Sequence, residues 1–153
     1  MERENHLAQL AQLAQTLNEQ TDAYTESLKQ LESKLRQMNL GVEAWVPLKE
    51  TRMSGTPDRD SSMRTLLGYA KTSEGWGFAV RDVRIERGFF EGDESCPWEN
   101  GYSEGEPKLL MKSSRELRIL AAGQIGELLT ALKAVGDEAV KAVYEARLLT
   151  EQA

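Results

Sequence analysis

Apolar residues near the start of the chain recur at alternating spacings of three and four. Counted from Leu7, this seam runs without a slip to Met38, and the spacing is that of the a and d positions of a coiled coil. From Glu2 to Asn39 the chain has neither Gly nor Pro and is rich in Gln, Leu and Ala, which favours a helix. The pattern predicts one long coiled-coil-like helix over residues 1–40. Its seam consists of Leu7, Leu10, Ala14, Leu17, Thr21, Tyr24, Leu28, Leu31, Leu35 and Met38.

A seam only two positions wide per heptad suits one or two partner helices better than a broad globular core. It predicts a homo-oligomer or, alternatively, a hairpin with a C-terminal helix of the same chain; a bundle of two hairpins would satisfy both. Gly41, just past the last periodic residue, is expected to cap the helix. Self-association is assigned to the large seam residues Leu7, Leu10, Leu17, Tyr24, Leu28, Leu31, Leu35 and Met38.

Residues 41–112 carry the alternation typical of strands. Val42, Ala44, Val46 and Leu48 fall on one face of a strand, and Pro47 places that strand at a sheet edge or at a strand end. Trp45 has the opposite parity. It therefore points away from the apolar set, toward either a second layer or solvent, where it would be available to a partner.

The clearest strand signal is a hairpin between Leu66 and Gly88, with its turn at residues 73–75 (Ser-Glu-Gly). Trp76, Phe78 and Val80 share one face, whereas Val83 and Ile85 have the opposite parity. Keeping all five on one buried side requires a β-bulge near Arg81-Asp82, which we predict. The body is expected to be an antiparallel sheet of three to five strands.

Two polar segments interrupt this body. Residues 51–65 contain Gly55 and Pro57 and are predicted to form a mobile loop. Residues 91–106 contain six acidic and no basic side chains together with several Gly and Pro, and are predicted to form an acidic loop.

A second apolar periodicity occupies residues 113–153. Ser113 and Glu116 have the spacing of a capping box, and the apolar stripe that follows is broad enough to pack on the sheet or on the first helix. Gly123, Gly126 and Gly136 are candidate kinks or sites of close approach to the first helix, and Gly136-Asp137 is a candidate break that would divide this helix in two. The fold class is therefore α+β: a long N-terminal helix, a small antiparallel sheet and a C-terminal helix in one structural unit.

The charge distribution limits the kinds of partner that the chain is expected to bind. The net charge is -6, and outside the acidic loop 19 basic residues balance 19 acidic ones. No basic tract is present to displace counterions, so neither nucleic acid nor an anionic membrane surface is expected as a partner. The start of the chain lacks signal-peptide features, no apolar run approaches ~18 residues, and a single cysteine suits a reducing compartment. These features favour the cytoplasm.

The residues that usually carry chemistry are sparse. His6 is the only histidine and lies at the start of the first helix, and Cys96 is surrounded by acids that disfavour its thiolate. The glycines form no phosphate-binding motif, and the acidic loop does not match a calcium-binding loop. No catalytic, cofactor-binding or metal site is predicted, and no cofactor is expected.

One cluster points toward ligand binding. Arg81, Arg84 and Arg87, with Lys71 on the paired strand, would form a cationic strip on the sheet. Asp82 and Glu86, which lie between these arginines, favour ordinary ion pairs as the alternative. The residues considered for ligand or partner contact are Trp45, Lys71, Arg81, Arg84 and Trp98.

Three functions follow from these patterns. The favoured one is a non-enzymatic, self-associating adaptor that presents its β body to a protein partner not identified by the sequence. The alternative is a small ligand-binding or regulatory domain that uses the cationic strip. An enzyme working through Asp, Glu and Arg alone is a third class, because carboxylates can do acid–base chemistry without histidine.

Overall fold

The computed structural model describes residues 1–55, 59–89, 95–103 and 105–152. The chain divides into two compact units, Met1–Asn39 and Leu40–Ala153. Each is described by itself.

The first unit is a single helix, α1 (Glu2–Met38), of 37 residues. At ~1.5 Å per residue it is roughly 55 Å long, which confirms the predicted long helix. Asn39 ends it with left-handed dihedrals, φ 53 and ψ 49, and its N–H donates to the carbonyl of Arg36. The predicted cap at Gly41 is therefore wrong by two residues, because asparagine also tolerates the left-handed conformation.

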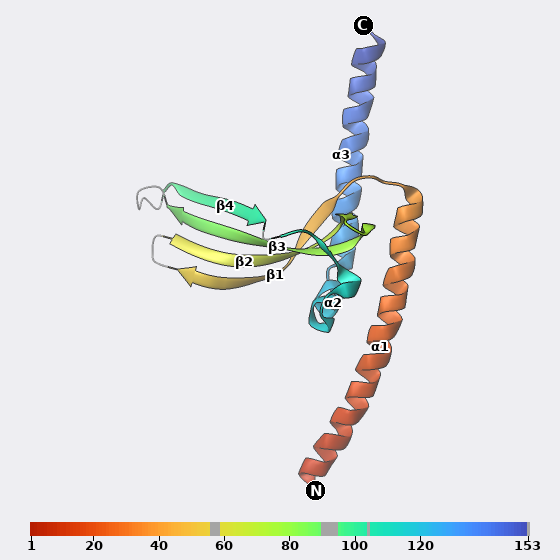
Figure 1. Ribbon diagram of the computed structural model, residues 1–153, viewed down its shortest axis with the longest axis vertical. Coiled ribbons are helices and arrows are strands. Elements are labelled where there is room, and N and C mark those ends of the chain that lie inside the picture. Colours follow the sequence, from red (N-terminus) through yellow and green to blue (C-terminus); the bar gives the residue numbers. More distant parts are fainter. Residues whose placement is uncertain (56–58, 90–94, 104, 153) are drawn as a thin grey trace. The chain divides into compact units, whose positions relative to one another are not determined.

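The second unit is built on an antiparallel sheet whose main strands lie in the order β1-β2-β3-β4 (Figure 1). The short β5 pairs with the same strand, β3, that carries β4. This confirms the predicted antiparallel sheet and the α+β class. The strands are β1 (Ala44–Gly55), β2 (Arg59–Thr72), β3 (Gly75–Phe89), β4 (Pro97–Ser103) and β5 (Lys108–Leu109).

The predicted hairpin is the centre of the sheet. Strands β2 and β3 pair without interruption from Arg59 opposite Gly88 to Thr72 opposite Gly75. The Thr72 hydroxyl closes the turn, since it donates to the carbonyl of Gly75 at 2.9 Å and accepts from the N–H of Glu74 at 3.1 Å. Gly75 has φ +102, which glycine adopts without steric cost.

The loop predicted over residues 51–65 is wrong for most of its length. Residues 51–55 continue β1 and residues 59–65 begin β2, while 56–58 lie outside the described residues. The acidic loop predicted over residues 91–106 is also wrong in part, because Pro97–Ser103 forms β4; residues 90–94 and 104 are outside the described part. The polar side chains of these two segments pair across strands, so polarity does not mark a loop here.

The predicted bulge near Arg81-Asp82 is wrong as well. The β2–β3 register is continuous there, and the register shifts lie in β1, between Pro47 and Lys49 and between Arg52 and Ser54. Pro47 does lie in an edge strand, as predicted. No bulge is needed in β3, because Phe78 and Ile85 are both buried while belonging to opposite faces of the sheet.

Directly opposed residues in neighbouring strands share a face, so the register defines two faces. We call them the Phe78 face and the Trp45 face. At the end of the sheet nearest the hairpin turn, the Phe78 face is apolar and buried. Its buried apolar side chains are Ala44, Val46, Leu67, Tyr69, Phe78 and Val80.

Among the described residues, the C-terminal segment is divided into three helical elements, whereas a single helix is predicted over residues 113–153. A turn of 3₁₀-helix, η2 (Leu110–Lys112), precedes α2 (Arg115–Ala122) and α3 (Ile125–Glu151), and α2 and α3 are bent by 67°. The break is at Gly123-Gln124, so the kink expected at Gly123 is confirmed, whereas α3 continues through Gly136-Asp137 and the break expected there is wrong.

Ser114, not the predicted Ser113, caps α2. Its side chain accepts from the N–H of Leu117 at 3.3 Å, whereas the Ser113 hydroxyl donates to the carbonyl of Leu110. Downstream, α3 packs mainly against β1, and its Leu128 and Leu132 are buried. A C-terminal helix on the sheet was one of the two predicted placements.

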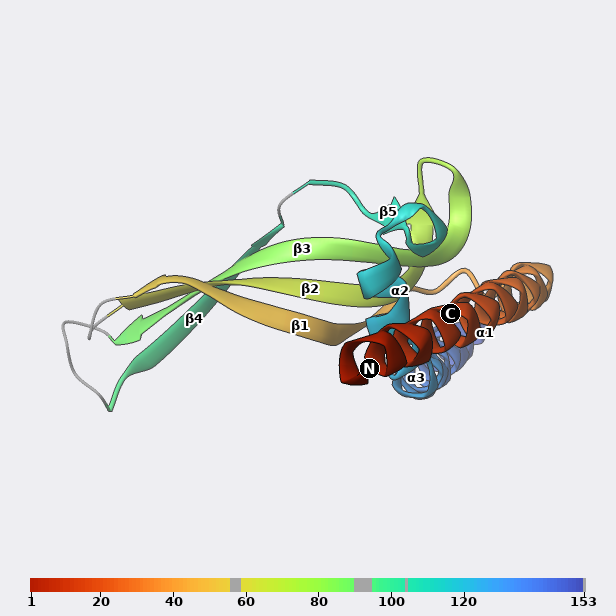
Figure 2. The same ribbon diagram turned by 90° about the horizontal axis from the view of Figure 1, so that it is seen from below.

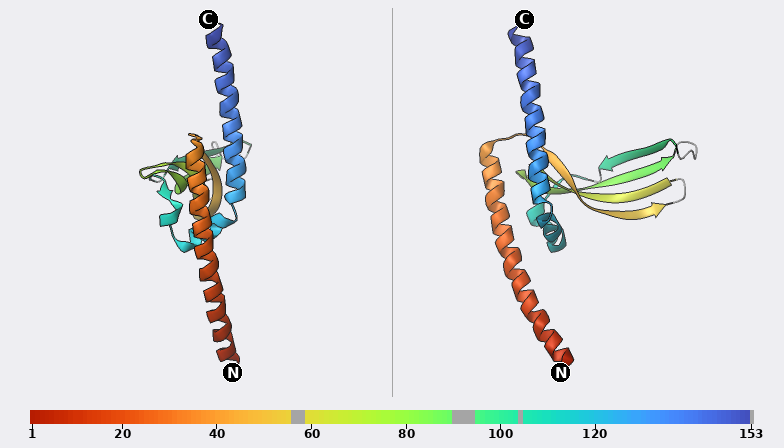
Figure 3. Two further views of the ribbon diagram at one scale, coloured as in Figure 1. Left: turned by 90° about the vertical axis from the view of Figure 1, so that its right-hand side faces the viewer. Right: turned by 180° about the vertical axis from the view of Figure 1, so that it is seen from behind.

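Figures 1 and 2 show the far ends of β1 to β4 extending away from α2 and α3, and the reverse view in Figure 3 shows the same projection. We call this projecting part the sheet arm. It comprises residues 49–55, 59–65, 82–89 and 97–103.

Candidate functional site

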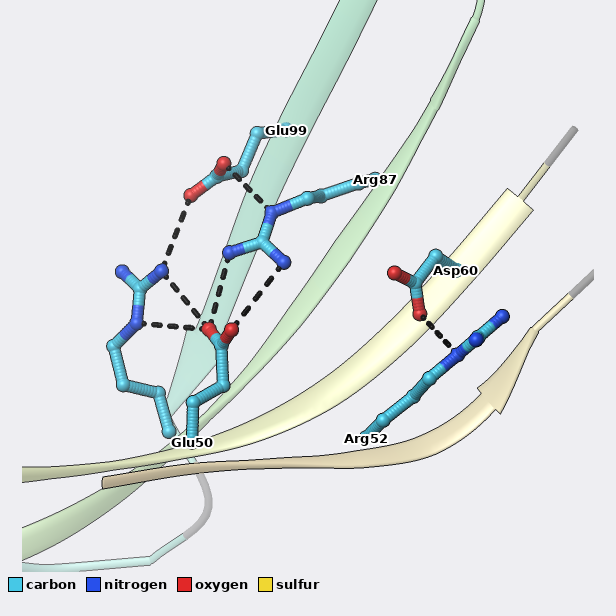
Figure 4. Close-up of polar contacts among 6 residues, drawn as sticks. Glu50, Arg52, Asp60, Arg87 and Glu99 are labelled. Atoms are coloured by element: carbon cyan, nitrogen blue, oxygen red, sulfur yellow. Dashed lines mark hydrogen bonds and ion pairs between the residues drawn. The ribbon is translucent and has the colours of Figure 1, made fainter.

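The sheet arm carries a cluster of four charged residues, one from each main strand, which we call the four-strand cluster (Figure 4). They are Glu50, Arg64, Arg87 and Glu99. The Glu50 carboxylate accepts from Arg64 Nε at 3.1 Å and from Arg87 Nη2 at 3.0 Å. Arg87 Nε donates to Glu99 at 3.0 Å, and Arg64 Nη2 lies 3.9 Å from the same carboxylate. Positive and negative groups therefore alternate around a closed ring.

The register explains why these side chains meet. Glu50 lies opposite Arg64, and Arg87 lies opposite Glu99, all on the Trp45 face. Ile85 lies between these two rows of that face and is buried, 5% exposed. Long charged side chains cover apolar surface with their stems while their charged ends stay in water. The stems of the cluster's side chains are thus placed to shield Ile85, in a part of the sheet that neither α2 nor α3 covers.

The electrostatics of the cluster favour fixed charges. Hydrogen bonding from Arg87, aided by Arg64, holds the pKa of the Glu50 carboxyl below its usual value, against a smaller effect of burial. Hydrogen bonding to Glu50 and then to Glu99 raises the pKa of Arg87. A carboxylate held ionised by two arginines is a poor proton acceptor at neutral pH. The cluster therefore stabilises the arm and does not suit acid–base catalysis.

Glu50→Gln is expected to lower the free energy of unfolding at neutral pH by less than about 1 kcal/mol, because the side chain is 36% exposed and solvent screens the pairs. The pKa of Glu50 is lower in the folded state. Its stabilisation is therefore present above the unfolded-state pKa and is lost as pH falls through the folded-state pKa. The free energies of unfolding of the wild type and of Glu50→Gln, measured by urea unfolding at several pH values, should converge as the pH falls.

The matched control for this comparison is Glu145→Gln, at an exposed position of α3. It should change the free energy of unfolding by no more than about 0.5 kcal/mol, as expected for an exposed position. A Glu50→Gln difference that persisted unchanged below the folded-state pKa would contradict an electrostatic role for the cluster.

The Phe78 face of the arm is lined by aromatic–arginine pairs. The Arg59 guanidinium lies 5.7 Å from the Trp98 ring, and that of Arg84 lies 5.7 Å from the Tyr102 ring. Glu86 pairs with both arginines, at 3.1 Å and 3.8 Å. Side chains of neighbouring strands therefore contact one another on both faces of the arm. These contacts stabilise a single sheet layer that is exposed to solvent on both faces.

Trp45 lies on the face opposite Ala44 and Val46, as its parity predicted. Its ring covers Gly68, where an added Cβ would come within 2.4 Å of ring carbon Cε3. The Arg81 guanidinium lies 4.5 Å from the ring, and the indole N–H donates to Glu43 at 2.7 Å. Trp45 is therefore half-buried, with Gly68 and Arg81 in contact with its ring and Glu43 hydrogen-bonded to its indole N–H.

The predicted cationic strip is not formed as one surface. Arg81 and Arg87 lie on the Trp45 face, whereas Lys71 and Arg84 lie on the Phe78 face. Lys71 is opposite Trp76, eight residues from Arg84 along β3, or roughly 26 Å at ~3.3 Å per residue. The structure thus brings together Trp45 with Arg81, but it separates Arg81, Lys71 and Arg84 from one another. Trp98 pairs with Arg59, which the sequence did not single out.

A pocket of about 530 Å³ lies beside β3 and the start of α2. Its charged lining is balanced, because Arg81, Lys108 and Lys112 are matched by three acids, Glu74, Asp82 and Glu106. Lys112 pairs with Glu74, and Asp82 accepts from the Thr65 hydroxyl at 2.7 Å. The balanced charges of its lining therefore give the pocket no preference for an anion.

The lone histidine and the lone cysteine lie in different units of the chain. His6 is in the first turns of α1, and Cys96 is exposed, with its Sγ 3.9 Å from the Ser95 hydroxyl. Within the described ranges, no group of three or more His, Cys, Asp and Glu side chains is arranged to hold a metal ion.

In the described residues, no individual helix has both the length and the apolar content to cross a membrane. The bent pair α2 and α3 meets those criteria only when the two helices are taken together.

The sequence missed the four-strand cluster. No sequence signal marks Glu50 or Glu99, and the predicted loop over residues 51–65 contains Arg64. Residues 59–65 carry Arg59, Asp60 and Arg64 among Ser, Met and Thr, and this pattern indicates a strand only once β2 is known to pair with β1 and β3.

Comparison with known proteins gives no relative. No protein-family model matches the chain, and no similar curated protein or solved structure was found.

Proposed function

We propose that this chain is a non-enzymatic, self-associating interaction protein in which the N-terminal half of α1 is an assembly element. The observation that carries the proposal is an apolar seam exposed to solvent. Leu7, Leu10 and Leu17 are 63%, 59% and 42% exposed. Leucines in register on one side of a helix are stabilised by burial against another helix, at roughly 25 cal/mol per Å² of apolar surface.

A second exposed stripe supports the proposal. In the C-terminal half of α3, Val140, Val143, Tyr144 and Leu148 are large, exposed and spaced by three and four residues. Apolar stripes at helical spacing on two helices of one chain suit a bundle built from more than one copy.

The chemistry of the described residues is consistent with an interaction role. The charged groups of the sheet arm are largely engaged in ion pairs or aromatic contacts, which fix the shape of the surface that the arm presents. We infer that the arm is the part offered to a protein partner, with α1 setting the number of copies.

The test is the solution mass of the full chain by light scattering over a concentration series. Leu10→Asp combined with Leu17→Asp buries charge at the seam, and it should lower the mass to that of a smaller assembly or a monomer. The matched control is Gln9→Asp combined with Thr16→Asp, seven residues apart on the same helix but off the seam; it should leave the mass unchanged.

Helix content by circular dichroism accompanies both measurements. If the seam variant and the control have the same mass as the unmodified chain, α1 is not an assembly element and the proposal fails. If the seam variant alone loses mass, the assignment stands.

A further inference from the structure

The outer edge of β4 is an open strand edge. Among the described residues, β4 pairs only with β3, and Figure 1 shows it as the outermost strand on its side of the arm. Alternate residues of such a strand direct their N–H and C=O groups outward, where another strand can pair with them. The segment is short, and Pro97 stands only at its first position.

The opposite edge of the sheet is protected. Strand β1 contains Pro47 within its length and two register shifts, at Pro47/Lys49 and Arg52/Ser54. Proline and bulges are the devices that prevent edge-to-edge pairing. Strand β4 has neither beyond its first residue, so the two edges differ in their capacity to accept a further strand.

The sequence of β4 is self-complementary about its centre. Trp98 and Tyr102 lie two residues on either side of Asn100, both on the Phe78 face, and Glu99 and Gly101 flank it on the other face. In an antiparallel pair of β4 strands related by a twofold axis at Asn100, Trp98 of each copy faces Tyr102 of the other. Glu99 faces Gly101, so no like charges are directly opposed.

Other registers lack this match. A pair centred on Glu99 would oppose two carboxylates, which is unfavourable. A pair centred on Gly101 would set Tyr102 against Asn100 and so form no pair between Trp98 and Tyr102. A pair centred on Trp98 or on Tyr102 would oppose one aromatic pair only. The register centred on Asn100 opposes two aromatic pairs and sets no like charges against each other.

Arginines of the sheet arm lie next to both aromatic residues of β4. Arg59 lies in one row with Gly88 and Trp98, and its guanidinium lies 5.7 Å from the Trp98 ring. Arg84 lies beside Tyr102 in the same way. Each new aromatic pair would therefore be flanked by an arginine from each copy, an arrangement in which cation–π and ring contacts reinforce one another.

We propose that β4 is a self-association edge, which pairs antiparallel with β4 of a second copy of this chain, about Asn100, to join two sheets into one continuous sheet. This interface is independent of the α1 seam. The two can therefore be tested separately.

The register is tested by disulfide cross-linking in the full chain with Cys96→Ser. Under mild oxidation Asn100→Cys should give a covalent dimer, because a residue on the twofold axis lies across from itself. Ser103→Cys is the matched control. It lies opposite Pro97 of the other copy, so its two thiols would be roughly 20 Å apart at ~3.3 Å per residue and should not cross-link efficiently.

The strength of the pairing is tested in the Leu10→Asp, Leu17→Asp background, where α1 no longer contributes. Light scattering over a concentration series should still show a dimer, and adding Asn100→Lys should reduce it to a monomer because two ammonium groups are opposed at the axis. Ser103→Lys, exposed on the same strand, should leave the dimer intact.

The outcomes separate the two proposals. If Asn100→Cys cross-links no better than Ser103→Cys, or if Asn100→Lys leaves the mass unchanged, the β4 inference is overturned while the α1 seam is unaffected. If the α1 substitutions leave the mass unchanged but Asn100→Lys lowers it, β4 stands and the α1 proposal fails.

Discussion

Phe78→Ala is expected to lower the free energy of unfolding by about 3–5 kcal/mol, the cost of removing a large buried aromatic side chain and leaving a cavity. Phe78 has no solvent exposure. It lies opposite Tyr69 with ring centroids 6.0 Å apart in an edge-to-face arrangement, and Tyr69 in turn stacks on Trp76 at 5.6 Å. A loss of this size is a large part of the ~5–15 kcal/mol that stabilises an ordinary domain.

Urea unfolding followed by tryptophan fluorescence measures this loss, since Trp76 is in the same aromatic cluster. Leu149→Ala is the control, because Leu149 is 72% exposed and its truncation should change the free energy by no more than about 0.5 kcal/mol. A Phe78→Ala loss as small as that of the control would show that the core is not at the Phe78 face.

Gly68→Ala is expected to destabilise the chain by about 1–3 kcal/mol, as overpacking does. The added Cβ would lie 2.4 Å from Trp45 Cε3 and 2.8 Å from the carbonyl oxygen of Ala44. The ring is held by Arg81 and Glu43, and the carbonyl belongs to the paired strand. Neither obstacle is the free end of a flexible side chain, so the backbone of β1 must move.

Gly126→Ala is the matched control. Nothing lies within 4 Å of a Cβ at that position in α3, so the change should be neutral or stabilising by up to about 1 kcal/mol. In a Trp45→Ala background the cost of Gly68→Ala should fall in part, since the ring is removed and the carbonyl remains. An unchanged cost there would mean that the Trp45 ring does not restrict Gly68.

Several features were predictable because their cause lies within a short stretch of chain. The heptad seam and the absence of Gly and Pro predicted α1, whose hydrogen bonds all form within the helix. The turn at residues 73–75 predicted the β2–β3 hairpin, because a tight turn brings its own flanking strands into register. The parity of Trp45 placed it on the face opposite Ala44 and Val46.

The errors share a different cause. Residues 51–55 and 59–65 are polar and were predicted to be a loop, but they are strands because Glu50, Arg64 and their partners on β3 and β4 form ion pairs across the sheet. The bulge was predicted on the assumption that one face is buried along all of β3. In fact Phe78 and Ile85 are buried on opposite faces, at different positions along the strand.

The sequence by itself determined the long helix, the central hairpin and the α+β class, because periodicity and turn chemistry act between residues near each other in the chain. The tertiary structure decided the extent of the strands, the four-strand cluster, the separation of Arg81 from Arg84 and Lys71, and the open edge at β4. These depend on which distant residues pair across strands, and the local pattern of polar and apolar positions contains no information about that pairing.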